Sequence, residues 1–329
     1  MSKTSVTVEH VVEYLPEAPT RRTKPSRLSA PVRISRVAAA DIEQALVTYL
    51  PTTRELRPIM KWAGGKRQVL PAIRPLVPAS YNRYIEPFLG GGAVLFDLAP
   101  SRAIVNDLNT ELISMYETVR DFPNELIDVL TSFATSVEAF YEIRAWDRDP
   151  VAFAKRSVVE KAARTIYLNR TGFNGLYRVN SRNEFNVPYG KYANPRVCDK
   201  DLIHFVSDYL SSSKVEFRNE DFRKVIARAR AGDFLYVDPP YAPLDDAAST
   251  FTSYTSDGFG YQDLLDLRAA LDRATERGAT WLLSNVKSRA TMRLFPKVRY
   301  RVTEVQVTRP INSCADGRGS VPEILVSPR

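Results

Sequence analysis

The chain has 329 residues, 44% of them hydrophobic, which is enough to bury one large core or two. No apolar run approaches the roughly 20 residues of a membrane helix, and the N-terminus lacks the apolar core of a secretory signal. We therefore expect a globular protein that stays in the cytoplasm, without a membrane partner. The two cysteines, Cys198 and Cys314, have no metal or redox spacing, so we expect reduced thiols and no metal site.

The net charge of +8 favours an acidic partner such as nucleic acid. Residues 155–196 concentrate this charge, with nine Lys or Arg against two acids. Residues 20–36 hold six basic residues, two prolines and no acid, which predicts a basic, mobile arm over 1–55. A solvated tail and an arm that contacts phosphates are both compatible with this composition.

After the arm, strand and helix patterns alternate. Residues 83–98 predict a strand, a glycine turn and a helix, and residues 102–109 predict a second strand. Helical periodicity follows over 111–167, and then a polar, aromatic loop region to about residue 194. Further strands are predicted at 215–222, 233–241, 280–286 and 300–307, with a helix over 261–278 that Gly278 ends.

This alternation predicts an α/β fold with a doubly wound, mixed but mostly parallel sheet. The basic helical stretch interrupts the sheet, so we expect an inserted, mostly helical domain at 110–198. The sheet domain would then comprise 56–109 and 199–329. Ligands of such sheets bind beyond the carboxyl ends of the strands, where four polar groups are predicted: Glu86-Pro87-Phe88, Asn106-Asp107, Asp221-Phe222 and Asp238-Pro239-Pro240-Tyr241.

A glycine turn follows the first of these strands. Gly90, Gly91 and Gly92 lack side chains and let a ligand approach the backbone, although a purely structural turn remains an alternative. The pattern is not the G-x-G-x-x-G dinucleotide fingerprint. Asp107, at the end of the next strand, is suitably placed for ribose hydroxyls, so the combination suggests a bound adenosine moiety.

Another loop, "MKWAGGKRQVL" over 60–70, places a tryptophan, two glycines and two lysines before a helix. It fits a loop over a ligand carboxylate or phosphate, or a plain helix-start turn.

The fourth strand end carries the most specific chemistry. Pro239 and Pro240 remove two N–H donors and stiffen the chain, which leaves the Asp238 carboxylate and a carbonyl as rigid acceptors. Such a pair suits an NH2 group, and Tyr241 supplies a flat face for an aromatic ring. Holding both hydrogens biases a planar amine towards a pyramidal, nucleophilic form. The pattern therefore predicts reaction at an exocyclic amine.

Seven segments in series resemble the DNA adenine methylase (Dam) family over about 57–327: "KWAGGK", "EPFLGGGAVLF", "VNDLN", "YLNRTGFNGLYRVNSRNEFNVPYGKY", "NEDF", "DPPYAPL" and "RPINSCADGRGSVPEILV". The resemblance implies a Rossmann-like methyltransferase fold that uses S-adenosyl-L-methionine. Asp238, Pro239, Pro240 and Tyr241 would be catalytic. The cofactor residues that it implies are Trp62, Ala63, Gly64, Lys66, Glu86, Pro87, Phe88, Gly90, Gly92, Asp107, Asp221, Phe222 and Asp238.

The same resemblance implies double-stranded DNA as the partner, with no obligate protein partner, and methylation of adenine N6 in GATC after the base flips out. In the insertion, Phe173 would fill the vacated stack and Arg178 would bind a guanine. The full set of implied DNA contacts is Lys61, Arg170, Phe173, Asn174, Gly175, Leu176, Arg178, Asn186, Pro188 and Tyr192. Packing within the loop remains the alternative for each of them.

Two other hypotheses remain open: transfer to the amine of cytosine or to an amide, and a catalytically idle DNA-binding protein. The sequence departs from the resemblance at Ala193-Asn194, where many relatives carry lysines, and in the N-terminal arm. A restriction-modification, repair or phage-encoded role is equally compatible, in a bacterial cell or a phage-infected host.

Overall fold

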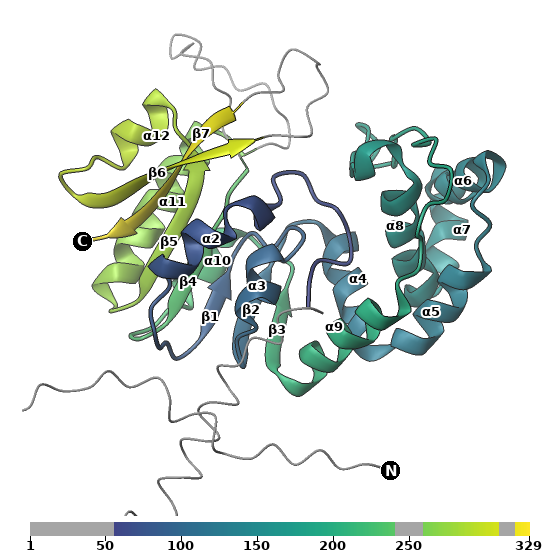
Figure 1. Ribbon diagram of the computed structural model, residues 1–329, viewed down its shortest axis with the longest axis horizontal. Helices are drawn as coiled ribbons and strands as arrows, with labels where there is room; N and C mark the ends of the chain where they lie inside the picture. The colour runs from purple at the N-terminus through teal and green to yellow at the C-terminus, as the bar shows by residue number, and fades with distance from the viewer. Residues whose placement is uncertain (1–55, 241–258, 309–319) are drawn as a thin grey trace, which may run out of the picture. The chain divides into compact units, whose positions relative to one another are not determined.

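A computed structural model describes residues 56–240, 259–308 and 320–329 (Figure 1). These ranges belong to one compact unit, residues 52–329. The predicted arm at 1–55, Tyr241 and Cys314 lie outside them. Among the helices of the described ranges, none has the length and apolar content needed to cross a membrane.

Seven strands in these ranges form one sheet, in the order β3-β2-β1-β4-β5-β7-β6. Strands β1 to β5 pair in parallel, whereas β7 runs antiparallel between β5 and β6. The predicted doubly wound mixed sheet is therefore confirmed, and its order reverses between β1 and β4, where such folds bind ligands. The strands are β1 (Tyr84–Glu86), β2 (Arg102–Asn106), β3 (Lys214–Arg218), β4 (Phe234–Val237), β5 (Thr280–Val286), β6 (Tyr300–Thr308) and β7 (Ser320–Pro328).

Successive side chains of the central strands enter two different cores, one on each face of the sheet. Tyr84 and Phe234 belong to the first core, and their neighbours Ile85 and Leu235 belong to the second. Because helices cover both faces, the parallel strands are buried on both sides. The first core includes α2 (Leu70–Ile73), α3 (Ala93–Leu98), α4 (Thr110–Asp121) and α9 (Lys200–Ser212), and the second includes α10 (Phe222–Ala227), α11 (Tyr261–Glu276) and α12 (Arg289–Leu294).

The chain between β2 and β3 is mostly helical. The helices from α5 to α8 are grouped on the β3 side of the sheet (Figure 1), and Phe140, Ile166 and Tyr167 are fully buried among them. After these helices, an isolated antiparallel bridge joins Val179 to Phe185, and backbone hydrogen bonds join Asn180 to Glu184 and Asn186 to Arg178 on either side of it; we call residues 177–187 the hairpin. The four helices are α5 (Pro123–Ser132), α6 (Val137–Arg144), α7 (Pro150–Lys155) and α8 (Val158–Thr171).

Polar side chains determine where several of these helices begin. Asn109 accepts a hydrogen bond from the Leu112 N–H at the start of α4, at 2.9 Å. A capping box of Ser157 and Glu160 starts α8. Asp221 likewise starts α10, so a carboxylate predicted to bind cofactor is also fixed by the helix that follows β3.

Candidate active site

A cavity of about 1150 Å³ opens at the carboxyl edge of the sheet. Its volume is slightly above the roughly 300–1,000 Å³ of most small-molecule sites, so it is large enough for a ligand of cofactor size. Because β1, β2 and β4 run parallel, the polar residues that follow them converge here. The predicted residues that line it are Lys61, Trp62, Ala63, Gly64, Lys66, Glu86, Pro87, Phe88, Gly90, Asp107, Arg170, Asp221, Phe222, Asp238, Pro239 and Pro240.

Asp238 follows β4 and forms an ion pair that the sequence did not predict. The Lys66 ammonium lies 2.9 Å from the Asp238 carboxylate and 4.0 Å from that of Glu323, on β7. The ammonium also donates a hydrogen bond to the Gly64 carbonyl at 2.9 Å. Burial raises the pKa of Asp238 to about 6, and the Lys66 charge opposes that rise. Two carboxylates and one cation thus meet where the amine chemistry was predicted.

Two buried polar residues brace the neighbouring strand ends. Glu86 accepts a hydrogen bond from the Tyr84 hydroxyl at 2.8 Å, and burial raises the pKa of Glu86 well above its usual range. The Asn106 amide donates to the carbonyls of Pro87 and Glu220, each at 2.9 Å, and accepts from the Glu220 N–H. Asn106 therefore fixes the ends of β1, β2 and β3 relative to one another.

The glycine turn is held by Asp107. Its carboxylate accepts the N–H groups of Gly90 and Asn109, both at 2.9 Å, while burial raises its pKa against the effect of these bonds. Gly90 has a φ of 49°, and a Cβ there would lie 2.9 Å from the Trp62 ring. Only glycine lets the indole approach this turn. Gly92, by contrast, starts α3 and does not line the cavity.

Aromatic rings form another wall. Phe88 and Phe222 lie 5.3 Å apart between ring centroids, and Phe259 lies 5.8 Å from each. The neighbouring Arg223 binds Asp221 at 2.8 Å, together with two carboxylates at the start of α11. Phe259 and Arg223 were missed because no sequence pattern places α11 beside α10.

The predicted DNA contacts lie on and around the segment after α8. Phe173 is 47% exposed, and Arg178 and Pro188 are also exposed, whereas Gly175 is buried beneath Lys61. The remaining predicted residues are partly buried. Leu176 packs against the core, and the Tyr192 ring centroid lies 5.7 Å from the Lys61 ammonium. Asn186 binds Arg178, Asn174 has a φ of 54°, and Arg170 donates a hydrogen bond to the Ile59 carbonyl.

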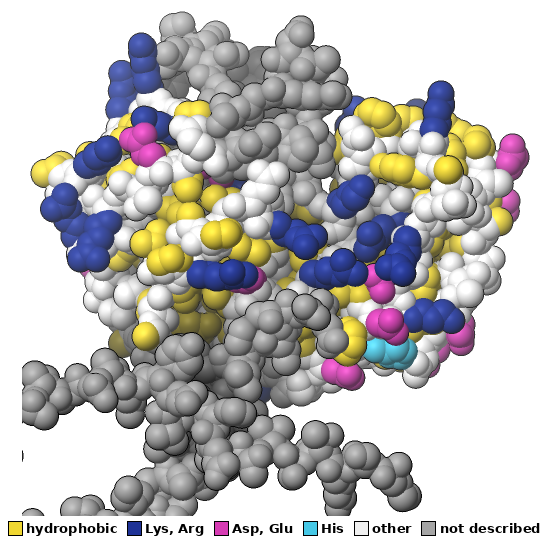
Figure 2. Space-filling model, in the orientation of Figure 1, with side chains coloured by type: hydrophobic (Ala, Val, Ile, Leu, Met, Phe, Trp, Pro, Cys, Tyr) yellow, Lys and Arg dark blue, Asp and Glu magenta, His cyan; other side chains and the backbone are white. Residues whose placement is uncertain are grey.

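A buried amide that the sequence did not single out joins this segment to the cavity loop. Asn169 is 1% exposed, and its amide exchanges hydrogen bonds with the backbone N–H and carbonyl of Lys61, at 2.9 and 2.8 Å. It also donates to the Gly175 carbonyl at 2.8 Å. Figure 2 shows Lys and Arg side chains gathered between the sheet and the helices on the β3 side, with few acids among them.

The sheet order and the polar strand ends over one cavity define a Rossmann-like α/β fold with a ligand site at the carboxyl edge of its sheet, as expected of a methyltransferase. The sequence pattern described as D12 class N6 adenine-specific DNA methyltransferase matches residues 62–311, and the chain belongs to this family. It is thus an adenine-specific DNA methyltransferase, and the predicted resemblance is confirmed. Neither transfer to cytosine nor a catalytically idle protein agrees with this membership.

Named relatives are similar to this chain over most of their own length. The Type II methyltransferase M1.LlaDCHI of Lactococcus lactis subsp. cremoris is 44% identical over 274 residues, covering 83% of this chain and 95% of the relative. The Type II methyltransferase M.MjaIII of Methanocaldococcus jannaschii is 36% identical over 83% of this chain and 99% of the relative. The DNA adenine methylase of Escherichia coli strain K12 is 33% identical over 82% and 94%.

Proposed function

We propose that the enzyme moves a methyl group from S-adenosyl-L-methionine to N6 of an adenine that has flipped out of double-stranded DNA, with GATC as its preferred site. One observation carries this proposal: Asp107, Asp221 and Asp238 open into a single cavity with aromatic walls. Acceptors suited to ribose hydroxyls and to two separate amino groups therefore share one space.

The residues present fit the cofactor. Asp107 is fixed by two backbone N–H groups and keeps lone pairs for ribose hydroxyls. Phe88 and Phe222 offer apolar faces for an adenine ring, and Asp221 is an acceptor beside them for its amino group. When bound, S-adenosyl-L-methionine supplies a methyl group activated by a positively charged sulfur.

The chain's own part in the transfer is to hold the target amine. Pro239 is buried and fixes the backbone after Asp238, whose ionised carboxylate accepts an amino hydrogen of the adenine. This interaction favours the nucleophilic form of the nitrogen. The Lys66 ammonium keeps Asp238 ionised at neutral pH despite its burial. Tyr241, outside the described residues, would stack on the base as the resemblance implies.

We assign DNA recognition to the insertion at residues 110–198, and catalysis to residues 56–109 together with residues 199–329. Flipping a base costs a few kcal/mol. The exposed ring of Phe173 is suited to fill the vacated stack, and the exposed guanidinium of Arg178 to bind guanine O6 and N7. Leu176 and Pro188 would contact thymine methyl groups, and Lys61 the outer guanine.

The test uses the full chain, radiolabelled S-adenosyl-L-methionine and a short duplex with one GATC site. We expect label only in N6-methyladenine after nucleoside digestion, and none with Asp238→Ala, which should still fold and bind the duplex. Duplexes with single-base changes in the site measure specificity. Label in another nucleoside would refute the reaction, and equal labelling of every duplex would refute the preferred site.

A further inference from the structure

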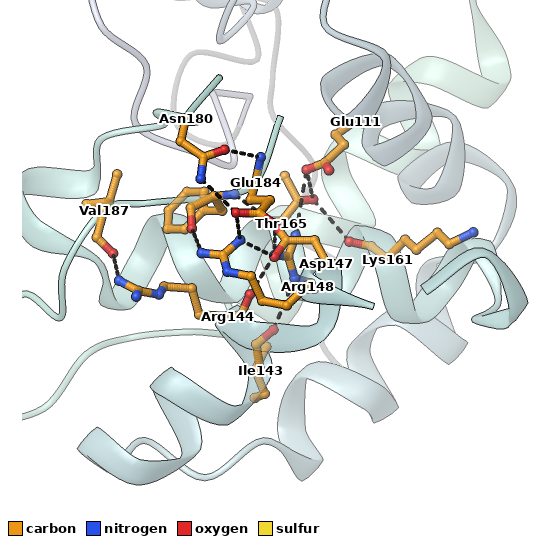
Figure 3. Close-up of polar contacts among 12 residues, drawn as sticks. Glu111, Ile143, Arg144, Asp147, Arg148, Lys161, Thr165, Asn180, Glu184 and Val187 are labelled. Carbon is orange, nitrogen blue, oxygen red and sulfur yellow. Dashed lines mark hydrogen bonds and ion pairs between the residues drawn. The ribbon is translucent and has the colours of Figure 1, made fainter. Parts of the chain in front are cut away.

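The hairpin 177–187 is attached to the helices through two consecutive side chains that act on one residue (Figure 3). The Phe185 N–H donates to the Asp147 carboxylate at 2.8 Å, and the Phe185 carbonyl accepts from the Arg148 guanidinium at 2.6 Å. Phe185 is 3% exposed. Asp147 and Arg148 thus occupy the place that a neighbouring strand would take, and we call this pair the clamp.

The clamp is itself held by buried charges. Asp147 binds Arg148 at 2.6 Å and Arg164, from α8, at 2.5 Å. The Arg164 side chain is 1% exposed and also donates to the carbonyls of Ile143 and Arg144, at the end of α6. Charge-assisted hydrogen bonds of this kind are short and strong, so the clamp has a defined position on the helices.

Across the hairpin, the residue after Phe185 binds Arg178 on the opposite strand. The Asn186 N–H donates to the Arg178 carbonyl at 3.0 Å, and the Asn186 side chain accepts from the Arg178 Nε at 2.7 Å. Among the described residues, the guanidinium is bonded only through Nε, and its two terminal nitrogens would meet guanine O6 and N7. A shift of Phe185 would move Asn186, and with it the guanidinium.

We propose that Asp147 and Arg148 are positioning residues for base discrimination. They fix the hairpin backbone so that Arg178 meets its guanine without first being ordered, and they touch neither DNA nor the reacting atoms themselves. This inference rests on the proposed function of Arg178.

The experiment is a double-mutant cycle with Arg148→Ala, Arg178→Ala and the double variant. The readout is the ratio of kcat/KM between the GATC duplex and a duplex with the contacted guanine replaced. We expect Arg148→Ala to lower this ratio about tenfold, because small misplacements of a contact group are costly. In the Arg178→Ala background, Arg148→Ala should lower it no further.

Arg120→Ala is the matched control, since Arg120 is 27% exposed against 32% for Arg148 and its guanidinium pairs with Asp121 and lies over Phe217 rather than against the hairpin. It removes the same charge and should leave the ratio unchanged. Arg148→Lys and Arg148→Gln keep a donor near the Phe185 carbonyl and should restore part of the discrimination. These two variants replace Arg148→Ala in the cycle if Arg148→Ala does not fold.

Two outcomes would refute the positioning role of the clamp. One is a kcat/KM ratio that Arg148→Ala leaves unchanged, and the other is an equal fall of the ratio on Arg148→Ala in the presence and in the absence of Arg178. An equal fall of kcat/KM on every duplex leaves the ratio unchanged and counts as the first. If instead Arg178→Ala alone leaves the ratio unchanged, the proposed contact of Arg178 with guanine fails, and the clamp fails with it.

Discussion

Lys66 and Asp238 form an ion pair of 2.9 Å in the wall of the cavity. Asp238 follows β4, Lys66 precedes α2, and Glu323 approaches the same ammonium from β7. The protonation of Asp238 is therefore set by burial together with two charged neighbours of opposite sign.

Methyl transfer should fall as the pH falls through about 6, the pKa of Asp238. The pKa is raised above the usual value of about 3.9, so the carboxyl takes up a proton in a range where most aspartates stay ionised. A protonated Asp238 is a poorer acceptor for the adenine amine. Single-turnover rates at saturating cofactor and duplex should be flat above about pH 7 and decline about tenfold per unit below 6. A rate fully retained at pH 5 would contradict this role.

Replacing Lys66 by methionine should move the midpoint of that profile to higher pH. The substitution keeps the length of the side chain and removes the charge that lowers the Asp238 pKa. The rate at neutral pH should drop and recover partly in alkaline buffer. The same single-turnover series measures the shift, and a midpoint that stays near 6 would show that Lys66 does not control this proton.

Glu323→Gln should move the midpoint the other way. The Glu323 charge raises the pKa of Asp238, so a neutral side chain of the same shape lets Asp238 ionise at lower pH. Activity at pH 5 should then exceed that of the wild type. Shifts in the same direction for Lys66→Met and Glu323→Gln would exclude the charge-coupling explanation.

Gly90→Ala should weaken the cofactor site and the fold together. The position has a φ of 49°, which costs a non-glycine residue about 1–2 kcal/mol, and the new Cβ would meet the Trp62 ring at 2.9 Å. We expect a lower melting temperature and a raised KM for S-adenosyl-L-methionine. Gly260→Ala is the control, since its Cβ meets its nearest neighbour at 3.8 Å. Equal melting temperatures and equal KM values for the two variants would argue against close packing at the turn.

The sequence predicted most of the fold because its strands are short apolar runs with polar ends, as at Glu86 and Asp238. In a parallel sheet those ends must meet at one edge, so the residues of the cavity were found from local pattern and resemblance. The ion pair of Lys66 with Asp238 and the approach of Glu323 were not predicted, since the three residues lie far apart in the chain and β7 enters the sheet out of sequence order. One signal was available: Glu323 is a charged residue within an apolar strand, where it is rarely buried without a partner.

The clamp was beyond prediction for a different reason. Asp147 and Arg148 bind the backbone of Phe185 rather than its side chain, and periodicity or motif spacing says nothing about such contacts. The same holds for Asn169 with Lys61. Tertiary hydrogen bonds of this type appear only once the path of the chain is known.

Trp62 touches two structures with different tasks. Its indole covers Gly90 in the glycine turn and stacks on Tyr177 of the hairpin, with ring centroids 5.3 Å apart. A ligand that shifts the indole at the turn would also act on Tyr177, and thermodynamic reciprocity makes the resulting coupling equal in both directions. Donor and duplex would then change each other's affinity by the same factor, whichever of them binds first.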